Sequence, residues 1–599
     1  MKSSPPASGN PPCDFEEAPH IHVADSVCSM ESSPDISGND SSISSSGIQN
    51  DGEGMVEKNL LPGVAQAEAV TRIWNKNTLF VAYGCIFLVY CINSLQFQVQ
   101  LALNPYVASA FNSHALTSVV IVESYILSGI LQPPMSKILD YWGRAEGLVV
   151  IVSISALGNA LTAVCKNVPG YVVAQSFTNV GFQGLMYVLS VIVADTTSLA
   201  NRAFAFAFAQ CPFIFTAFAG PALAQSFYSK AGFRWVFGCF AIIMPTVSLP
   251  IIGLLFYHQR KAKRLGILTK IRSGRSTLKS IKHFAVEFDV TGTFLIFVGL
   301  SLFLLPFSLT GPELYKWTSP AILGMIIPGI GFLVAFGLWE QFGASTPYLP
   351  GNILLMPSVI GAALTCIGSF GAYYCWDNYF TSFLQVMKGV DIQQAGFIGN
   401  IPNLANSSCG LIVGYLVRVS GRFKWLGWAV MPLQFAGGIM ISIFTRSDSK
   451  LAYLIISQIL VSLGGGTLYV CGEMAAMAVA GHDGMAAVLA FQNLCMALGV
   501  SLGGAFAGAI WSNTIPGQLM KFLPDDAKKD VAKIYGNLEL QLSFDFGHPV
   551  RTALVNSYSV AQFRLGVAGT CILLITLVGV ALWRDVHVKK LKQMGGVVL

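Results

Sequence analysis

The stretch "SKILDYWGRAEG", from Ser136 to Gly147, sets a short polar turn between two long apolar runs. A related turn, "VRVSGRFKW" from Val417 to Trp425, returns in the same kind of setting far down the chain. Glycine permits a tight turn between helices, and arginine offers a fork of donors to helix ends or carboxylates. The repeated Gly-Arg pair therefore predicts two related halves, each with a polar turn at the same side.

The composition predicts a polytopic membrane protein built from α-helices. The chain has 599 residues, of which 53% are hydrophobic and only 11% are charged, whereas soluble domains carry about a quarter charged residues. Apolar runs of about twenty residues recur along it, and each is long enough to cross a bilayer core of roughly 30 Å. The alternating strands of a membrane β-barrel are not found in the sequence.

These apolar runs predict fourteen transmembrane helices, at about 78–99, 115–138, 147–165, 170–194, 203–226, 235–257, 289–309, 319–340, 354–376, 393–417, 425–445, 451–474, 485–511 and 563–583. Basic residues gather in the loops that follow the even-numbered helices, which predicts that both termini are cytosolic. Residues 1–74 are rich in Ser, Pro, Gly and acid, and this composition predicts a disordered cytosolic tail. The basic segment 258–288 is interpreted as a cytosolic linker, with binding of anionic lipid headgroups as the alternative.

Charged residues beside the two polar turns predict a gate on the cytosolic side. Two bundles that rock about a central site need contacts that hold one side shut. The candidate gate residues are Asp140, Gly143, Arg144, Asp195, Arg202, Gly421 and Arg422.

Two acids lie inside predicted helices and are candidates for proton coupling. A charged group costs a few kcal/mol inside a membrane, so a surviving acid there is a functional candidate. Glu123 lies within the second predicted helix, and Glu473 follows the glycine run Gly464–Gly466. The alternative for each is a structural hydrogen bond to a neighbouring helix.

An aromatic block, "FGAYYCWDNYF" from Phe370 to Phe380, ends the ninth predicted helix on the outer side. It could line a vestibule for a bulky ligand, or it could be an interfacial aromatic belt. The candidate substrate contacts are Tyr373, Tyr374, Trp376, Asp377, Asn378, Tyr379 and Phe380. The residues that follow the first predicted helix are similarly placed: Gln96, Gln98, Gln100 and Asn104.

The sequence favours neither a resident metal nor an enzyme. The thirteen cysteines show no C-x-x-C spacing, and the eight histidines are scattered, so we expect no metal site and no cofactor. No nucleophile elbow, P-loop or dinucleotide fingerprint is present. The formal charge of +6 is explained by cytosolic loops, so nucleic acid is not an expected partner.

With these features in place, "LDYWGRAEG" resembles the loop-2/3 signature of the major facilitator superfamily, in the form used by fungal siderophore–iron transporters. The resemblance extends from about residue 75 to 590 and includes four further stretches: "VIVADTTSLANRAF" (Val191–Phe204), "AFAGPALAQSF" (Ala217–Phe227), "GGAFAGAIWSNTIPGQL" (Gly503–Leu519) and "DVAKIYGNLELQLSFDFGHPVR" (Asp530–Arg551). One departure is that the arginine of proton-driven drug exporters is not evident in the fourth helix, which offers Gln175, Asn179 and Gln183 instead.

The resemblance implies an all-α major facilitator fold with fourteen helices in a 6+2+6 arrangement. The implied parts are a six-helix bundle at 75–257, two additional helices at 289–340, the main part of a second bundle at 341–512, an extracellular loop at 513–562, the last helix at 563–585 and a cytosolic end at 586–599. Apolar residues at helical spacing between 513 and 559 suggest that this loop could form a lid, or a mere spacer.

The implied function is import of ferric siderophores of the hydroxamate type by proton symport with alternating access. A chelated cargo fits the lack of metal ligands, because the chelator already fills the coordination sphere of the ferric ion. Alternatives are a proton-coupled glutathione or haem carrier, a multidrug:proton exporter and a nutrient sensor that keeps the fold. We expect a monomer in the bilayer of the plasma membrane, with endosomal, vesicular or vacuolar membranes as the alternative.

Overall fold

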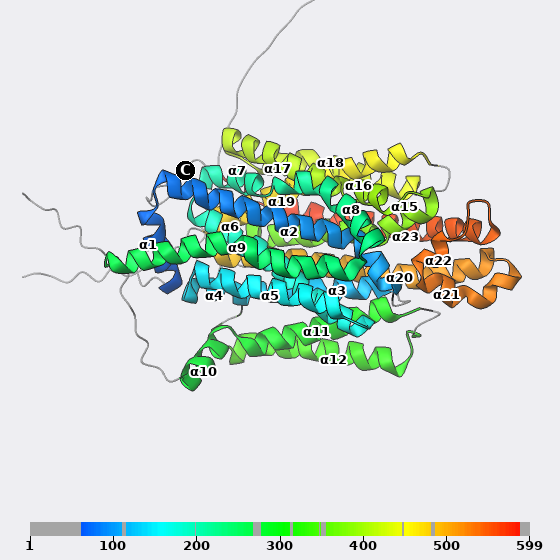
Figure 1. The fold of residues 1–599 in the computed structure, drawn as a ribbon, viewed down its shortest axis with the longest axis horizontal. Helices are drawn as coiled ribbons and strands as arrows, with labels where there is room; N and C mark the ends of the chain where they lie inside the picture. Colours follow the sequence, from blue (N-terminus) through cyan, green and yellow to red (C-terminus); the bar gives the residue numbers. More distant parts are fainter. Residues whose placement is uncertain are drawn as a thin grey trace, which may run out of the picture. The chain divides into compact units, whose positions relative to one another are not determined.

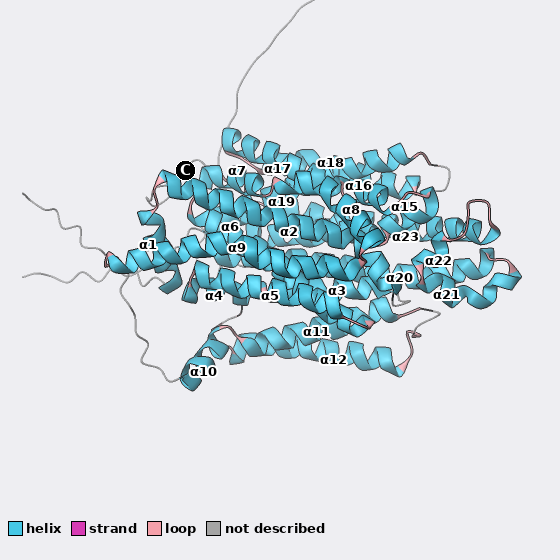
Figure 2. Cartoon of the chain, in the orientation of Figure 1, coloured by secondary structure: helices cyan, strands magenta, loops and turns pink. Residues whose placement is uncertain are grey.

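The computed structural model describes residues 62–110, 116–197, 199–267, 277–311, 315–346, 348, 355–445, 449–480 and 485–587. Helices make up nearly all of this part of the chain (Figure 2). Most of the predicted tail, residues 1–61, lies outside the described residues.

The helices form two groups with a pair of helices beside them (Figure 1). The N-terminal group consists of α2 (Lys76–Ala110), α3 (Thr117–Ile130), α4 (Gln132–Trp142), α5 (Arg144–Val164), α6 (Val168–Asp195), α7 (Leu199–Ala209), α8 (Pro212–Lys230) and α9 (Phe233–Arg264). The C-terminal group consists of α14 (Pro357–Asp377), α15 (Phe380–Lys388), α16 (Ile392–Gly399), α17 (Ile401–Ser420), α18 (Lys424–Phe444), α19 (Leu451–Ala480), α20 (Met485–Phe522) and α23 (Pro549–Leu582). The pair is α11 (Val290–Leu309) and α12 (Pro320–Leu338), preceded by α10 (Thr277–Glu287) and followed by a π-helical turn at Trp339–Gly343.

The two groups meet along a seam made of helices from both. On one side of the seam α3 packs on α20, and on the other α7 and α8 pack on α16 and α17. Glycine allows the close approach of α3 to α20, since a Cβ at Gly508 would lie 3.0 Å from the Ser118 Cβ.

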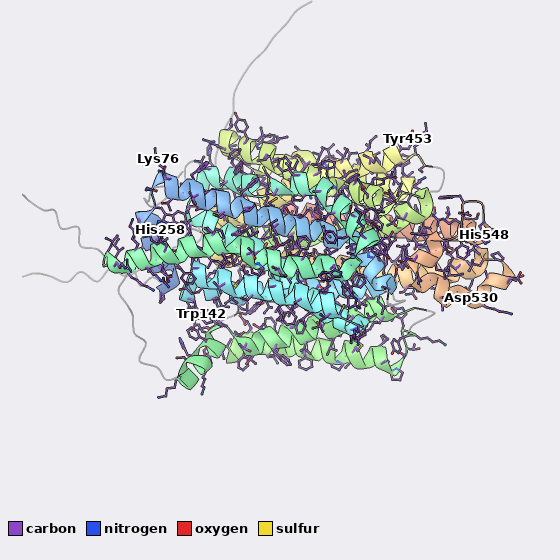
Figure 3. All side chains as sticks on the ribbon, viewed as in Figure 1. Lys76, Trp142, His258, Tyr453, Asp530 and His548 are labelled. Atoms are coloured by element: carbon purple, nitrogen blue, oxygen red, sulfur yellow. The ribbon has the colours of Figure 1, made fainter. Side chains whose placement is uncertain are left out.

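The helix groups have two ends, which we name by what lies there: the latch end, at the first polar turn around Arg144, and the cap end, opposite to it. The latch end carries Arg144, and Lys76 and His258 mark it in Figure 3. The cap end carries a 3₁₀ turn at Asp525–Asp530 and two short helices, α21 (Val531–Gly536) and α22 (Leu538–Leu542), which together we call the lid. Asp530 and His548 mark the cap end in the same view (Figure 3).

Prolines explain where long helices are interrupted. Proline removes a backbone donor and disfavours helical geometry in the residue before it. It stands at the first or second position of α4, α8 and α17, directly after the breaks at Leu131, Cys211 and Asn400. Among the described residues, twelve helices are long and apolar enough to span a membrane, and the broken pairs α3–α4 and α16–α17 are not among them.

Several predicted boundaries were wrong. α2 continues to Ala110, α20 continues to Phe522 and α23 begins at Pro549, so the loop predicted at 513–562 is helical at both ends. Hydropathy missed these extensions because their polar residues are buried against other helices, as Gln100 and Gln562 are. Part of the predicted tail is also ordered, since α1 (Pro62–Ile73) packs on α4, α6 and α9.

Replacing Gly158 by alanine should destabilise the N-terminal group. A Cβ there would lie 2.3 Å from the Thr178 backbone nitrogen of α6, so the helices must separate. We expect the free energy of unfolding to fall by about 1–3 kcal/mol, as overpacking does elsewhere. The measurement is the midpoint of heat-induced loss of monodisperse protein in detergent.

The matched control is Gly253→Ala on α9, where a Cβ would meet nothing within 4 Å. This variant should unfold at the same temperature as the parent or slightly above it, because alanine favours a helix over glycine. Equal midpoints for the two variants would show that the α5–α6 contact is not tight.

Candidate functional site

A pocket of about 240 Å³ lies between the two helix groups. Its walls come from α2, α3, α6, α7 and α8 on one side and from α14, α17, α18, α19 and α20 on the other. The aromatic lining residues are Phe97, Tyr125, Phe182, Phe206, Phe213, Phe370, Tyr373, Tyr374 and Tyr469. Amide side chains add hydrogen-bonding groups: Gln183, Gln210, Asn403, Asn406, Gln434 and Asn493.

Glu473 is the carboxylate that lines this pocket, and no lysine or arginine is among the described lining residues. The side chain is 8% exposed and is hydrogen-bonded to Tyr469, one helical turn earlier on α19. The glycine run before it brings α17 close, since a Cβ at Gly466 would lie 2.9 Å from Asn406 Oδ1. The structure thus places one predicted acid in the pocket.

Glu123, the other predicted acid, lies outside this pocket at the contact between α3 and α11. Its Oε2 accepts a hydrogen bond of 2.9 Å from Ser301 Oγ on α11, and it does not line the pocket. The two acids proposed for one role therefore occupy different places in the molecule.

The aromatic block divides between two environments. Tyr373 and Tyr374 line the pocket, and the Tyr374 hydroxyl is 2.9 Å from the Tyr125 hydroxyl across the seam. Trp376, Tyr379 and Phe380 are instead buried in the apolar core at the cap end. Among them, the Tyr379 ring stacks on Trp511 with centroids 4.0 Å apart. These three do not line the pocket, because Trp376 at the end of α14 and Tyr379 and Phe380 at the start of α15 pack into this core.

The two polar residues between Trp376 and Tyr379 do not line the pocket either. Asp377 is hydrogen-bonded to Tyr373 and is not a lining residue of the pocket. Asn378 is buried.

The glutamines of α2 are buried within the helix rather than following it. Gln98 Oε1 accepts a hydrogen bond of 3.2 Å from Asn403 Nδ2, which joins α2 to α17 across the seam. Gln96 and Gln100 are also buried, and Asn104 accepts a hydrogen bond from Tyr171. Of these residues, Gln98 is the one that reaches a pocket-lining side chain.

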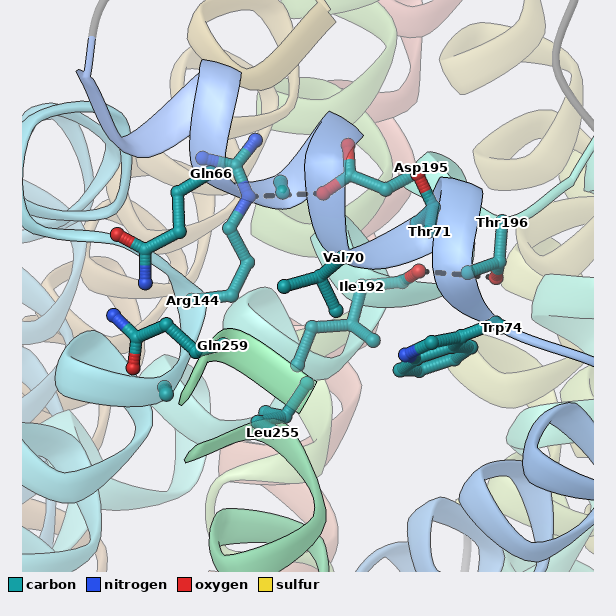
Figure 4. Close-up of a pocket in the computed structure, with 12 residues that line it drawn as sticks. Gln66, Val70, Thr71, Trp74, Arg144, Ile192, Asp195, Thr196, Leu255 and Gln259 are labelled. Atoms are coloured by element: carbon teal, nitrogen blue, oxygen red, sulfur yellow. Dashed lines mark hydrogen bonds and ion pairs between the residues drawn. The ribbon is translucent and has the colours of Figure 1, made fainter. Parts of the chain in front are cut away.

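The residues predicted as a gate at the first polar turn form a largely buried charge network. Arg144 Nε donates to Asp195 Oδ2 at 2.9 Å (Figure 4). Its Nη1 donates to Asp140 Oδ1 at 3.2 Å and to the Leu139 carbonyl at 2.9 Å. Arg202 donates to the Ala194 and Thr197 carbonyls at the end of α6. We call Asp140, Arg144 and Asp195 the latch.

Helix α1 covers the latch and was not predicted. Gly143 has φ 115°, a conformation that side chains rarely adopt, and a Cβ there would lie 3.0 Å from Gln66 Nε2 of α1. Gln66 and Val70 lie with Arg144 and Asp195 around a small cavity (Figure 4). The signal that could have revealed α1 is weak, because a short run of alanine and valine is its only apolar face.

The second polar turn shares a positive-φ glycine with the first, but it has neither the backbone conformation nor the charge network of the first. Gly421 ends α17 with φ 68°, as a helix C-cap glycine does. Arg422 pairs with Asp585 at 3.5 Å, and the two side chains are 58% and 49% exposed. Exposed pairs of this kind are worth about 0–1 kcal/mol, so the two turns are unequal.

Neither a metal cluster nor a disulfide is found among the described residues. No group of three or more His, Cys, Asp or Glu side chains there could hold a metal ion, and the described cysteines are free. The pocket therefore offers rings, amides and one carboxylate, which suits an organic ligand. Helices that bury such a pocket between two groups define a membrane carrier.

Comparison with known proteins agrees with the assignment as a membrane carrier. The family model for the Major Facilitator Superfamily matches residues 86–386. The chain is 38% identical to MFS siderochrome iron transporter D of Aspergillus fumigatus, covering 91% of both chains. It is 38% identical to MFS siderochrome iron transporter 1 of Ajellomyces capsulatus (92% and 94% covered) and 36% identical to siderophore iron transporter mirB of Emericella nidulans (91% of both). The chain therefore belongs to the siderochrome iron transporters of this superfamily.

A solved structure shows the same fold at low sequence identity. The bacterial homolog of the human lysosomal transporter Spinster, in an inward-facing and unoccupied conformation, superimposes with a TM-score of 0.53 at 12% identity. The match covers 85% of this chain and 98% of that one.

Proposed function

We propose that this protein imports ferric siderophores of the hydroxamate type by proton symport, with the two helix groups rocking about the pocket. The observation that carries the proposal is the lining of the pocket: rings and amides with one carboxylate and no described basic residue. A ferric trihydroxamate has no net charge at its metal centre, and it presents carbonyl and amide groups that rings and amides can bind. Such a lining disfavours anionic cargo, because nothing in it offsets a negative charge.

Glu473 is the proton site of this proposal. It is the acid that cargo would meet, and Tyr469 supplies a hydroxyl to orient it. Glu123 is left out of the coupling step because it lies outside the pocket.

The finer topology belongs to the same proposal. The broken pairs α3–α4 and α16–α17, added to the twelve apolar helices, give fourteen spans in a 6+2+6 arrangement with α11–α12 as the additional two. Exposed basic residues at the end of α9, among them Arg260 and Lys263, support a cytosolic position for the latch end. Both termini are then cytosolic, and the protein works as a monomer in the plasma membrane, with endosomal, vesicular or vacuolar membranes as the alternative.

In this proposal the lid closes the outer side of the pocket. It contacts the N-terminal group through the Leu538 amide, which donates to Ser109 Oγ at 3.3 Å, and through Glu539, which accepts a hydrogen bond from Tyr228. It contacts the C-terminal group through Gln541, which accepts from Tyr558 and Arg551. The lid thus joins both groups at the cap end.

The function is tested with a ferric trihydroxamate carrying one isotope on iron and another on the ligand. Cells with the protein should accumulate both labels together, with uptake abolished by a protonophore, and cells without it should not. The redox-inert gallium chelate should compete equally, because the intact chelate is the cargo. Uptake of glutathione or haem in its place, or efflux of the chelate, would support an alternative carrier and contradict the proposal.

Fixing the lid to the N-terminal group should stop uptake. In the variant Ser109→Cys, Leu538→Cys, oxidation should join the lid to α2 and lower uptake about tenfold or more, because the outer side cannot open. Reduction should restore the rate, and each single substitution treated alike serves as the control. Full uptake by the cross-linked protein would show that the lid does not gate the pocket.

A further inference from the structure

The helix pair α11–α12 is attached to different helix groups at its two ends. At the latch end it is held by the N-terminal group. Lys137 Nζ of α4 donates to the Glu287 carbonyl at 3.0 Å, and the Tyr141 hydroxyl donates to Glu287 Oε1 at 2.5 Å. Tyr348, which follows α12, donates to the Ile130 carbonyl of α3.

At the cap end the pair is held by the C-terminal group. Asn513 Nδ2 of α20 donates to the Thr310 carbonyl at 3.2 Å, and the Ser512 hydroxyl donates to the same oxygen. Gly311 approaches α20 so closely that a Cβ there would lie 3.0 Å from the Ser512 Cβ. The pair therefore crosses the seam from one group to the other, beside α3 and α20.

Between these anchors α11 packs on α3 through apolar side chains, and one side-chain hydrogen bond joins the two helices among the described residues. Ser301 Oγ donates to Glu123 Oε2 at 2.9 Å, and Glu123 Oε1 is buried without a hydrogen-bond partner among the described residues. An acid inside a membrane is costly, and the contact that satisfies one of its oxygens is therefore favoured.

We infer that α11–α12 is a brace across the seam and that the Glu123–Ser301 hydrogen bond is its releasable clasp, which keeps the cap end shut. This inference rests on the rocking motion of the proposed function. When the groups part at the cap end, Thr310 follows α20 while Ile130 and Glu287 remain with the N-terminal group. The segment of α11 that carries Ser301 must then leave α3. Glu123 is a positioning residue, and it acts on the equilibrium between the two states rather than on cargo.

The test reads the opening of the cap end directly. Ser118 of α3 is fully buried against α20 there, so Ser118→Cys reports opening by its reaction with a membrane-impermeant maleimide added outside the cell. The parent chain without the reporter gives the background from native cysteines. Uptake of the labelled ferric trihydroxamate is measured in the same cells, and each variant is corrected for its amount in the membrane.

Removing the clasp should raise labelling and slow uptake. Ser301→Ala and Glu123→Ala should each label about fivefold faster, the population shift that follows loss of one hydrogen bond. Glu123→Gln keeps an oxygen that can accept from Ser301, so its labelling and uptake should stay within about twofold of the parent. Ser308→Ala is the matched control on α11, because the Ser308 hydroxyl is buried and has no hydrogen-bond partner in the described part.

Two results would overturn the brace. Unchanged labelling in Ser301→Ala and Glu123→Ala would mean that the pair moves with the N-terminal group as one body. Loss of uptake in Glu123→Gln as complete as in Glu123→Ala, with parental labelling, would mean that Glu123 exchanges protons. Labelling of the cysteine at position 118 needs no cargo, so the two proposals can fail separately. Faster labelling in Ser301→Ala and Glu123→Ala, in cells that do not accumulate the trihydroxamate, would support the brace and reject the proposed cargo.

Discussion

Glu473→Gln should lose proton-driven accumulation of the ferric chelate while still exchanging it across the membrane. Glutamine keeps the size and the hydrogen-bonding oxygen of Glu473 but cannot release a proton, so binding survives and coupling does not. We expect net uptake to fall by about a hundredfold, the order that one positioned proton-transfer group contributes in enzymes. The measurement pairs net uptake under a proton gradient with exchange of labelled for unlabelled chelate in vesicles without one.

The comparison with Glu123→Gln makes this result specific. Both substitutions remove one buried acid from a helix, but only Glu473 lines the pocket. Retained accumulation in Glu473→Gln would exclude it as the proton site. Loss of exchange together with accumulation would instead assign it to cargo binding.

Arg144→Ala should have the largest effect at the latch end. It removes the cation that pairs with Asp195 and Asp140 and leaves two carboxylates facing each other beneath α1. Breaking a buried pair costs about 3–5 kcal/mol, and the partial exposure of these carboxylates, about a fifth each, reduces that figure to about 2 kcal/mol here. We expect a clear loss of thermal stability in detergent and at least about a tenfold loss of uptake for that free-energy cost.

Arg422→Ala is the matched variant in the second polar turn. Its pair with Asp585 is long and about half exposed, so uptake and stability should stay within about twofold of the parent. Equal losses of uptake and stability in Arg144→Ala and Arg422→Ala would contradict the difference between the two polar turns and would favour two equivalent gates.

The sequence predicted the parts of the site that a local pattern can carry. The Gly-Arg turn after an apolar run led to the charged cluster of the latch, and an isolated acid after a glycine run led to Glu473 in the pocket. Their roles as gate and proton site stay predictions. The helix content followed from composition. These predictions depend on neighbours in the chain, which the sequence displays.

The rest depended on which way each helix faces. Tyr373 and Tyr374 reach the pocket, whereas Trp376 and Phe380 do not, although all four lie within eight residues. The amides Asn406 and Gln434 line the pocket but stand in apolar helices, where the interruption by a polar residue was their only signal. Glu123 resembled Glu473 in sequence, and the structure separates their positions, because Glu473 lines the pocket and Glu123 contacts Ser301.

Helix α1 has a practical consequence for purification and labelling of this protein. Gly63 lies so close to the Leu139 and Asp140 carbonyls that a Cβ would meet them at 2.4 and 2.6 Å, so the start of α1 is fitted to its site. A fluorescent protein or affinity tag should be joined ahead of residue 62, and a shortened chain that begins at the first long apolar helix would uncover Arg144 to water.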